Sequence, residues 1–212
     1  MKKLIINSEN SHLNDDNTVD IPAKSFSKKK IAILGASVVL IICIAVFVGV
    51  FAKRNNRHDY IQTITAAKYT MLKGAAEAET TCNLISAVWY NTIFEVHDTS
   101  TDKYTMYAGK FRKDFNDSIA ALHDSDEHSD HITTILACQS VAKDYMKELQ
   151  NPPKGLETCY DTLCNLYAEF TNLTELALNP QGTIQTFNLN YQSYDKSFMQ
   201  YYDMLEIQIP QE

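Results

Sequence analysis

Residues 31–52 form an uncharged, almost wholly apolar run, and this run limits what the chain can fold into more than any other feature. As an α-helix, 22 residues span roughly 33 Å, enough to cross a hydrocarbon core about 30 Å thick. Inside hydrocarbon a backbone must satisfy its own hydrogen bonds, and a helix does so within the segment. The run therefore predicts one transmembrane helix over residues 31–52.

The flanks of this run agree with a spanning helix. Lysines 28–30 precede it, and Lys53, Arg54 and Arg57 follow it, so that cations stand at both headgroup layers. A cleavable signal peptide has a shorter apolar region close to the N-terminus, whereas this run begins after 30 residues. Cleavage after the small residue Ala52 is the less favoured alternative.

Residues 1–30 are short and polar, and they cannot bury enough apolar surface to offset the entropy of ordering. We expect a disordered cytoplasmic tail. The positive-inside rule adds little, because lysines and arginines on the two sides of the run are nearly balanced. The predicted localisation is the cell membrane, crossed once, with the N-terminus cytoplasmic and a domain of residues 53–212 extracytoplasmic.

The composition of that domain narrows its fold and its partners. Residues 58–212 carry nine Lys and one Arg against twelve Asp and ten Glu, a net charge of −12. Such a surface repels phosphate backbones, so we expect no nucleic-acid partner. Proline is absent between Ala23 and Asn151, and glycine is scarce. Strand-rich domains need many tight turns, so the composition predicts an all-α fold.

Helical periodicity divides the domain into segments. Residues 58–96 repeat apolar side chains at spacings of three and four, and this pattern predicts a long first helix. A second helix is predicted over about 101–122 and a third over about 130–150, where Pro152 and Pro153 end it. The predicted core faces are Ile61, Ile64, Met71, Ala75, Ala78, Cys82, Ile85, Trp89, Ile93 and Val96; then Tyr104, Tyr107, Phe111, Phe115, Ile119 and Leu122; then Ile132, Leu136, Val141, Tyr145 and Leu149.

The last sixty residues have the most regular pattern. Apolar residues alternate at spacings of four and three on either side of the turn Asn179–Gly182. This pattern predicts a coiled-coil-like, antiparallel αα-hairpin that closes the bundle. Its seam consists of Leu156, Tyr160, Leu163, Tyr167, Phe170, Leu173 and Ala177, followed by Ile184, Phe187, Tyr191, Tyr194, Phe198, Tyr201 and Leu205.

This stretch, from Asn151-Pro152-Pro153 through Asn179-Pro180 to Phe187-Asn188, resembles uncharacterised single-pass membrane-anchored helical proteins of Gram-positive bacteria. The resemblance covers about residues 151–210, and it lies in packing positions and turns. It implies a bacterial cell-surface location and brings no activity, cofactor or site residue with it.

Four cysteines lie outside the apolar run: Cys82, Cys138, Cys159 and Cys164. An oxidising compartment would allow disulfides, with three possible full pairings. The favoured interpretation is that they are small apolar residues on the core faces of helices.

One stretch concentrates metal-ligating side chains. Residues 123–131 (HDSDEHSDH) hold three imidazoles and four carboxylates, and we take His123, Asp126, His128 and His131 as a candidate divalent-metal site. His128 and His131 lie one helical turn apart. A solvated loop with helix caps is the favoured alternative, so the prediction is of no obligatory cofactor.

No HExxH, GxSxG or Walker sequence occurs, and no catalytic residue is proposed. The leading hypothesis is a non-enzymatic membrane-anchored helical bundle at the cell surface. Its partners would be the bilayer through residues 31–52 and either an unidentified protein or a second copy. An extracytoplasmic sensor or ligand-binding domain with a membrane partner is the alternative, and a metal-binding protein using residues 123–131 is a weaker one.

Overall fold

The computed structural model describes residues 56–210. The predicted tail at 1–30, the predicted transmembrane helix at 31–52 and its cations Lys53 and Arg54 lie outside the described residues. Within 56–210, no helix combines the length and apolar character that a bilayer crossing requires.

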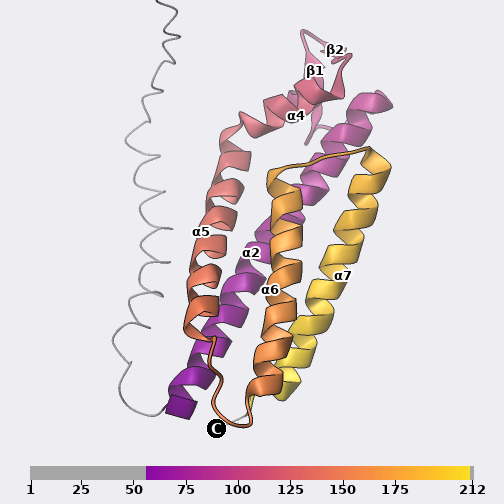
Figure 1. Ribbon diagram of the computed structural model, residues 1–212. Helices are drawn as coiled ribbons and strands as arrows, with labels where there is room; N and C mark the ends of the chain where they lie inside the picture. The colour runs from indigo at the N-terminus through magenta and orange to yellow at the C-terminus, as the bar shows by residue number, and fades with distance from the viewer. Residues whose placement is uncertain (1–55, 211–212) are drawn as a thin grey trace, which may run out of the picture.

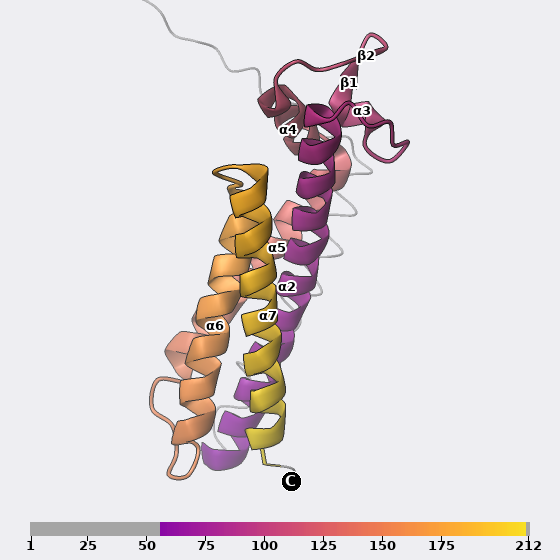
Figure 2. The ribbon, with the colours of Figure 1, turned by 90° about the vertical axis from the view of Figure 1, so that its right-hand side faces the viewer.

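Four long helices make up most of the described part: α2 (Asn56–Ile93), α5 (Asp126–Glu148), α6 (Glu157–Leu178) and α7 (Ile184–Gln208). They run alternately up and down, so that chain neighbours are antiparallel (Figures 1 and 2). With 38 residues, α2 is about 57 Å long. It packs against α4, α5, α6 and α7, and is the central element of the bundle. The helical bundle predicted for this part of the chain is confirmed.

The core lies along the predicted face of α2. The eight predicted positions from Ile61 to Trp89 are all buried. Three helices approach one another closely at Gly74, because a Cβ atom there would lie 2.7 Å from Cys138 Cβ and 2.8 Å from Phe170 Cε2. Lys68 is also buried, with Tyr69 and Tyr202 rings near its ammonium group and Glu206 of α7 as its ion-pair partner.

The predicted αα-hairpin is present as α6 and α7. Phe170, Phe187 and Phe198 are fully buried, whereas the seam tyrosines remain half-buried, as suits a side chain with an apolar ring and a polar tip. A capping box starts α7: the Thr183 hydroxyl accepts a hydrogen bond from the Thr186 amide at 3.2 Å, and the Thr186 hydroxyl accepts one from the Thr183 amide at 2.9 Å.

The predicted second helix over 101–122 is wrong. This segment contains the short helix α3 (Asp102–Thr105), the strands β1 (Met106–Tyr107) and β2 (Lys110–Phe111), and then α4 (Phe115–His123). The strands pair antiparallel, with Met106 opposite Phe111. Ala108 and Gly109 have φ angles of 50° and 78°, the left-handed pair that a two-residue type I′ turn requires and a helix excludes.

Four residues predicted for the core are exposed: Ile93, Val96, Tyr107 and Leu136. Tyr107 lies in β1 of the hairpin and is 73% exposed. Leu136 points outward on α5, where Ile135 is buried instead. Ile93 and Val96 lie at and beyond the end of α2, where no long helix continues alongside to cover them (Figure 2). The helical period identified these faces, but neighbouring helices decide which apolar positions are covered.

The four described cysteines are free thiols. Cys82, Cys138 and Cys159 are buried, which confirms their interpretation as core residues, and Cys164 is half-buried. Burial raises the pKa of Cys82 to about 12 and that of Cys138 to about 11. Thiols that stay protonated are poor nucleophiles and poor metal ligands.

Candidate functional site

The histidine-rich stretch lies where α4 gives way to α5. Ser125 caps α5, its hydroxyl accepting a hydrogen bond from the His128 amide at 3.3 Å. This cap places His128 in the first turn, with its side chain fully buried. Its ring meets the His123 ring edge to face, with centroids 4.6 Å apart. The structure therefore brings together two of the four predicted metal ligands.

The other two candidate residues are placed differently. His131 turns toward α2, where its Nδ1 lies 2.5 Å from Glu77 Oε2. Asp126 is the exposed first residue of α5. Within residues 56–210, no group of three or more His, Cys, Asp or Glu side chains is arranged to hold a metal ion. Glu77, 54 residues from His131, had no sequence signal linking it to this stretch.

His128 has an unusual environment for an imidazole. Among the described residues, neither ring nitrogen has a hydrogen-bond partner. Burial, followed by repulsion from His123 and His131, lowers the pKa of His128 to about 4. Burial also lowers the pKa of His123. Both rings are therefore neutral at pH 7, the protonation state in which imidazole coordinates a metal.

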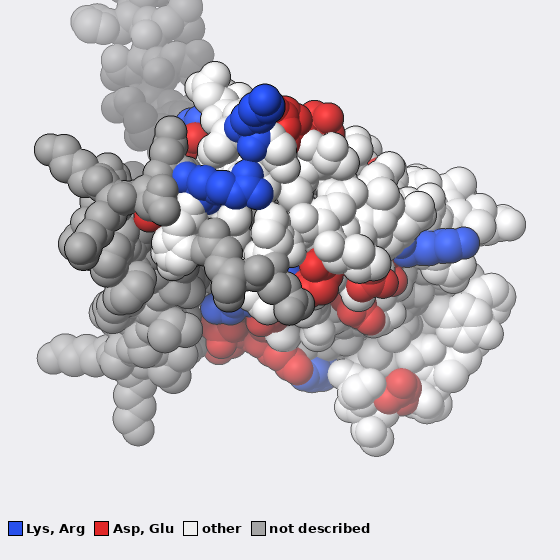
Figure 3. Space-filling view, turned by 90° about the horizontal axis from the view of Figure 1, so that it is seen from below, with Lys and Arg blue, Asp and Glu red and all other residues white. Residues whose placement is uncertain are grey.

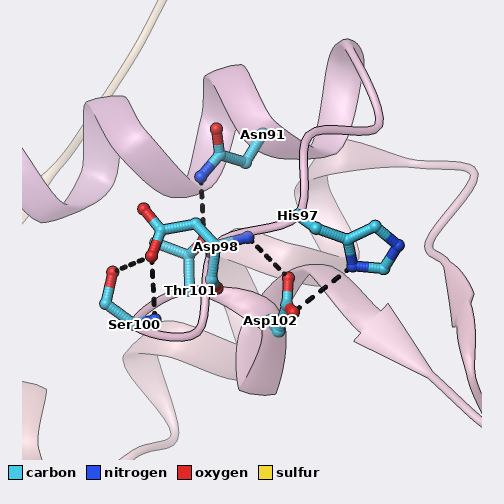
Figure 4. A network of polar contacts seen from close by, with 6 residues as sticks. All are labelled: Asn91, His97, Asp98, Ser100, Thr101 and Asp102. Carbon is cyan, nitrogen blue, oxygen red and sulfur yellow. Dashed lines mark hydrogen bonds and ion pairs between the residues drawn. The ribbon is translucent and has the colours of Figure 1, made fainter.

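A polar network follows the end of α2 (Figure 4). The buried Asn91 amide donates a hydrogen bond to Thr101 Oγ1 at 2.8 Å, and Asp98 Oδ1 accepts hydrogen bonds from the Ser100 amide and hydroxyl. His97 Nδ1 lies 3.3 Å from Asp102 Oδ2. Ser, His and Asp, the residue types of a catalytic triad, occur together here. The Ser100 hydroxyl, however, donates its hydrogen bond to Asp98 and not to His97. This arrangement caps a turn and does not activate a nucleophile.

Apolar side chains are exposed at this same end of α2. Tyr90, Ile93 and Phe94 share one face at helical spacing, with 48%, 45% and 58% of their surface exposed. The rings of Tyr90 and Phe94 are in contact, their centroids 4.5 Å apart. We call these three residues the α2 tip. It extends past the connection between α6 and α7 (Figure 2).

A groove lies between α5 and α6, with a volume of about 390 Å³. Its apolar wall contains Leu136, Tyr167 and Phe170, and Lys143 and Glu175 contribute opposite charges to its lining. Gln139 crosses between the two helices, donating hydrogen bonds to Thr174 Oγ1 at 2.9 Å and to Glu175 Oε1 at 3.3 Å. The groove therefore offers an apolar surface beside a pair of opposite charges.

Comparison of the chain with known protein families, curated proteins and solved structures finds no match to any of them. The resemblance of residues 151–210 to membrane-anchored proteins of Gram-positive bacteria thus stays a prediction.

Proposed function

We propose that this chain is a single-pass membrane protein whose extracytoplasmic helical bundle acts as a non-enzymatic interaction or structural module at the cell surface. The anchor is the apolar run at 31–52. The contact surface is the α2 tip, at the end of α2 farthest from that run.

The observation that carries this proposal is the exposure of the α2 tip. Three large apolar side chains lie side by side there, and each has between 45% and 58% of its surface exposed. Contiguous exposed apolar residues, aromatics above all, are typical of protein interfaces. The proposed partner at the tip is another protein or a second copy of the chain.

Site-specific photocrosslinking in native membranes tests the proposal. A photoreactive amino acid is placed at Phe94 in the full chain, and a matched one at Ala76, an exposed position halfway along α2. We expect covalent adducts from position 94 and few from position 76, with the adduct mass separating a second copy from another protein. Equal labelling at both positions, or none at 94, contradicts the proposal.

A sensor or ligand-binding domain is the second candidate, and the groove between α5 and α6 favours it. A small molecule bound there would raise the unfolding temperature of the folded chain. Substituting Ser140, which lines the groove, by tryptophan would fill it. A compound that stabilises the wild-type chain but not Ser140→Trp supports the sensor, whereas equal stabilisation of both excludes this groove as its site.

Metal binding at residues 123–131 remains a weaker candidate, supported by the contact between the neutral His123 and His128 rings. Saturating zinc should raise the unfolding temperature of the full chain and leave His128→Phe unchanged. No shift in the wild-type chain excludes zinc binding to the folded state.

A further inference from the structure

Three segments meet at the end of the bundle opposite the α2 tip. These are the start of α2, the connection 149–156 and the end of α7 (Figures 1 and 2). Arg57 Nη1 donates a hydrogen bond to the Lys154 carbonyl oxygen at 3.1 Å, and Cys159 Sγ donates one to the Gln208 carbonyl oxygen at 3.3 Å. We call this surface the base, and define it by Arg57, Lys154 and Ile207.

The length of chain between the base and the apolar run is short. Only three residues separate Ala52, the last of the run, from Asn56, the first of α2. Even fully extended, four Cα steps reach about 14 Å. The polar layer on each side of the hydrocarbon core is itself about 5–7 Å thick. If residues 31–52 span the bilayer, the start of α2 cannot lie far from the headgroups.

The side chains of the base suit such a position. Ile207 is 85% exposed, the largest value for any large hydrophobic side chain in the described residues. It lies in the last turn of α7, and its exposure to water has no explanation in the packing of the bundle. Arg57 and Lys154 are exposed at the same end. Exposed apolar and cationic side chains at the same end of a domain are a combination found where proteins meet the lipid interface.

Acidic side chains also lie at this end, and Figure 3 views it from below. Two of them have partners within the bundle: Glu157 accepts a hydrogen bond from the Gly155 amide at 2.6 Å, and Glu206 pairs with the buried Lys68. The proposed attraction to headgroups therefore comes from Arg57 and Lys154, because the net charge of residues 58–212 is negative.

We propose that the base rests on the lipid headgroup layer of the membrane in which the same chain is anchored. In this arrangement Ile207 enters the interface, and Arg57 and Lys154 contact lipid phosphates. The inference rests on the proposed function, because it requires residues 31–52 to span the bilayer. It adds an orientation: α2 stands away from the membrane, and the α2 tip is held roughly 57 Å from the base.

Tryptophan quenching by brominated lipids tests the base directly. The full chain is reconstituted in phosphatidylcholine–phosphatidylglycerol vesicles as Ile207→Trp or as Leu189→Trp. Both positions are exposed and both lie on α7, but at opposite ends of it. The wild-type chain gives the baseline, because its one tryptophan, Trp89, is buried far from the base.

We expect brominated lipid to quench the added emission of Ile207→Trp, which should also shift to shorter wavelength, and to leave Leu189→Trp unchanged. In the triple variant Arg57→Gln, Lys154→Gln, Ile207→Trp, quenching should decrease. If the added tryptophans of both single variants are insensitive to brominated lipid and equally quenched by aqueous acrylamide, the base does not meet the lipid.

Alkaline extraction of the same vesicles separates this failure from failure of the proposed function. If the Ile207→Trp chain stays in the membrane pellet while its added tryptophan remains unquenched, it has an anchor but no lipid contact at the base, which overturns this inference alone. A chain released by alkaline extraction has no spanning segment, and both proposals fail. A photoreactive amino acid at position 207, which should label lipid, repeats the test if Ile207→Trp does not fold.

Discussion

His128 is a buried titratable residue of the described bundle. Its imidazole is fully buried and lacks a partner for either nitrogen among residues 56–210, so the folded state excludes its charged form. The folded pKa is about 4, whereas an unfolded histidine titrates near 6.5. Between these two pH values the unfolded chain binds more protons than the folded chain. The neutral His128 ring therefore makes its full contribution to the free energy of unfolding above pH 6.5, and this contribution decreases as the pH falls toward 4.

We therefore predict that His128→Phe weakens the acid dependence of stability. Below pH 6.5, the free energy of unfolding of the wild-type chain should contain a term from His128 of up to about 1.4 kcal/mol per pH unit. Urea titrations of the detergent-solubilised full chain at several pH values measure it. His97→Gln, which removes an exposed histidine, is the control. Parallel pH profiles for wild type and His128→Phe would show that the imidazole is solvated.

Gly74 gives the second prediction at the scale of a residue. An alanine there brings its methyl group within 3 Å of both Cys138 and Phe170, on two different helices. Overpacking typically costs about 1–3 kcal/mol, against a gain of about 1 kcal/mol from better helix propensity. We expect Gly74→Ala to lower the urea midpoint, and Ala76→Gly, at an exposed position of α2, to measure the propensity term alone. A Gly74→Ala chain as stable as wild type would show that α5 and α6 can move away from α2.

Among the elements, the β1–β2 hairpin depends on two residues with positive φ. Gly109 adopts its φ of 78° without strain, whereas Ala108 at 50° does not. Ala108→Gly should relieve strain, and Gly109→Ala should cost about 1 kcal/mol, mainly within the hairpin. Amide exchange of Arg112, whose N–H bonds the Thr105 carbonyl beside the hairpin, reports this local opening. Unchanged exchange in Gly109→Ala would show that the turn tolerates a side chain.

The elements also show which parts of the fold could be predicted from sequence. In α2, α6 and α7, apolar residues recur at helical spacing over many turns, and each of these helices packs against several neighbours. The helices predicted from this spacing are therefore present in the structure. The segment 101–122 has aromatic spacings that fit a helix, but Gly109 and its turn break it. The predicted helix is wrong because the turn at Gly109 requires a positive φ angle, and a few apolar residues at helical spacing do not overcome that requirement.

In the candidate site, too, some contacts could be predicted from the sequence and others could not. Contact between His123 and His128 follows from their nearness in sequence and the Ser125 cap between them. The pairing of His131 with Glu77 depends on how α5 packs on α2, which no local pattern records. The exposure of the α2 tip likewise depends on where α6 ends and α7 begins. Local chemistry could be predicted from sequence, whereas contacts between distant elements could not.

For the molecule as a whole, α7 is the decisive element, because it closes the bundle on a face shared by α2 and α6. Phe187, Phe198 and Leu205 are each at most 1% exposed. Burying three such side chains contributes about 5–9 kcal/mol, comparable with the whole stability of a typical domain, about 5–15 kcal/mol. We predict that a chain ending at Asn179 loses cooperative unfolding and near-ultraviolet circular dichroism, because the remaining helices expose the faces that α7 covers.

The matched control is Leu189→Ser, which alters an exposed apolar side chain of α7 and leaves its core face intact. Its urea midpoint should stay close to that of the wild-type chain, since surface substitutions typically change stability by less than about 0.5 kcal/mol. If the truncated chain unfolded cooperatively at the wild-type midpoint, α2, α5 and α6 would form the stable core by themselves. α7 would then be a detachable helix, free to exchange its apolar face with a partner.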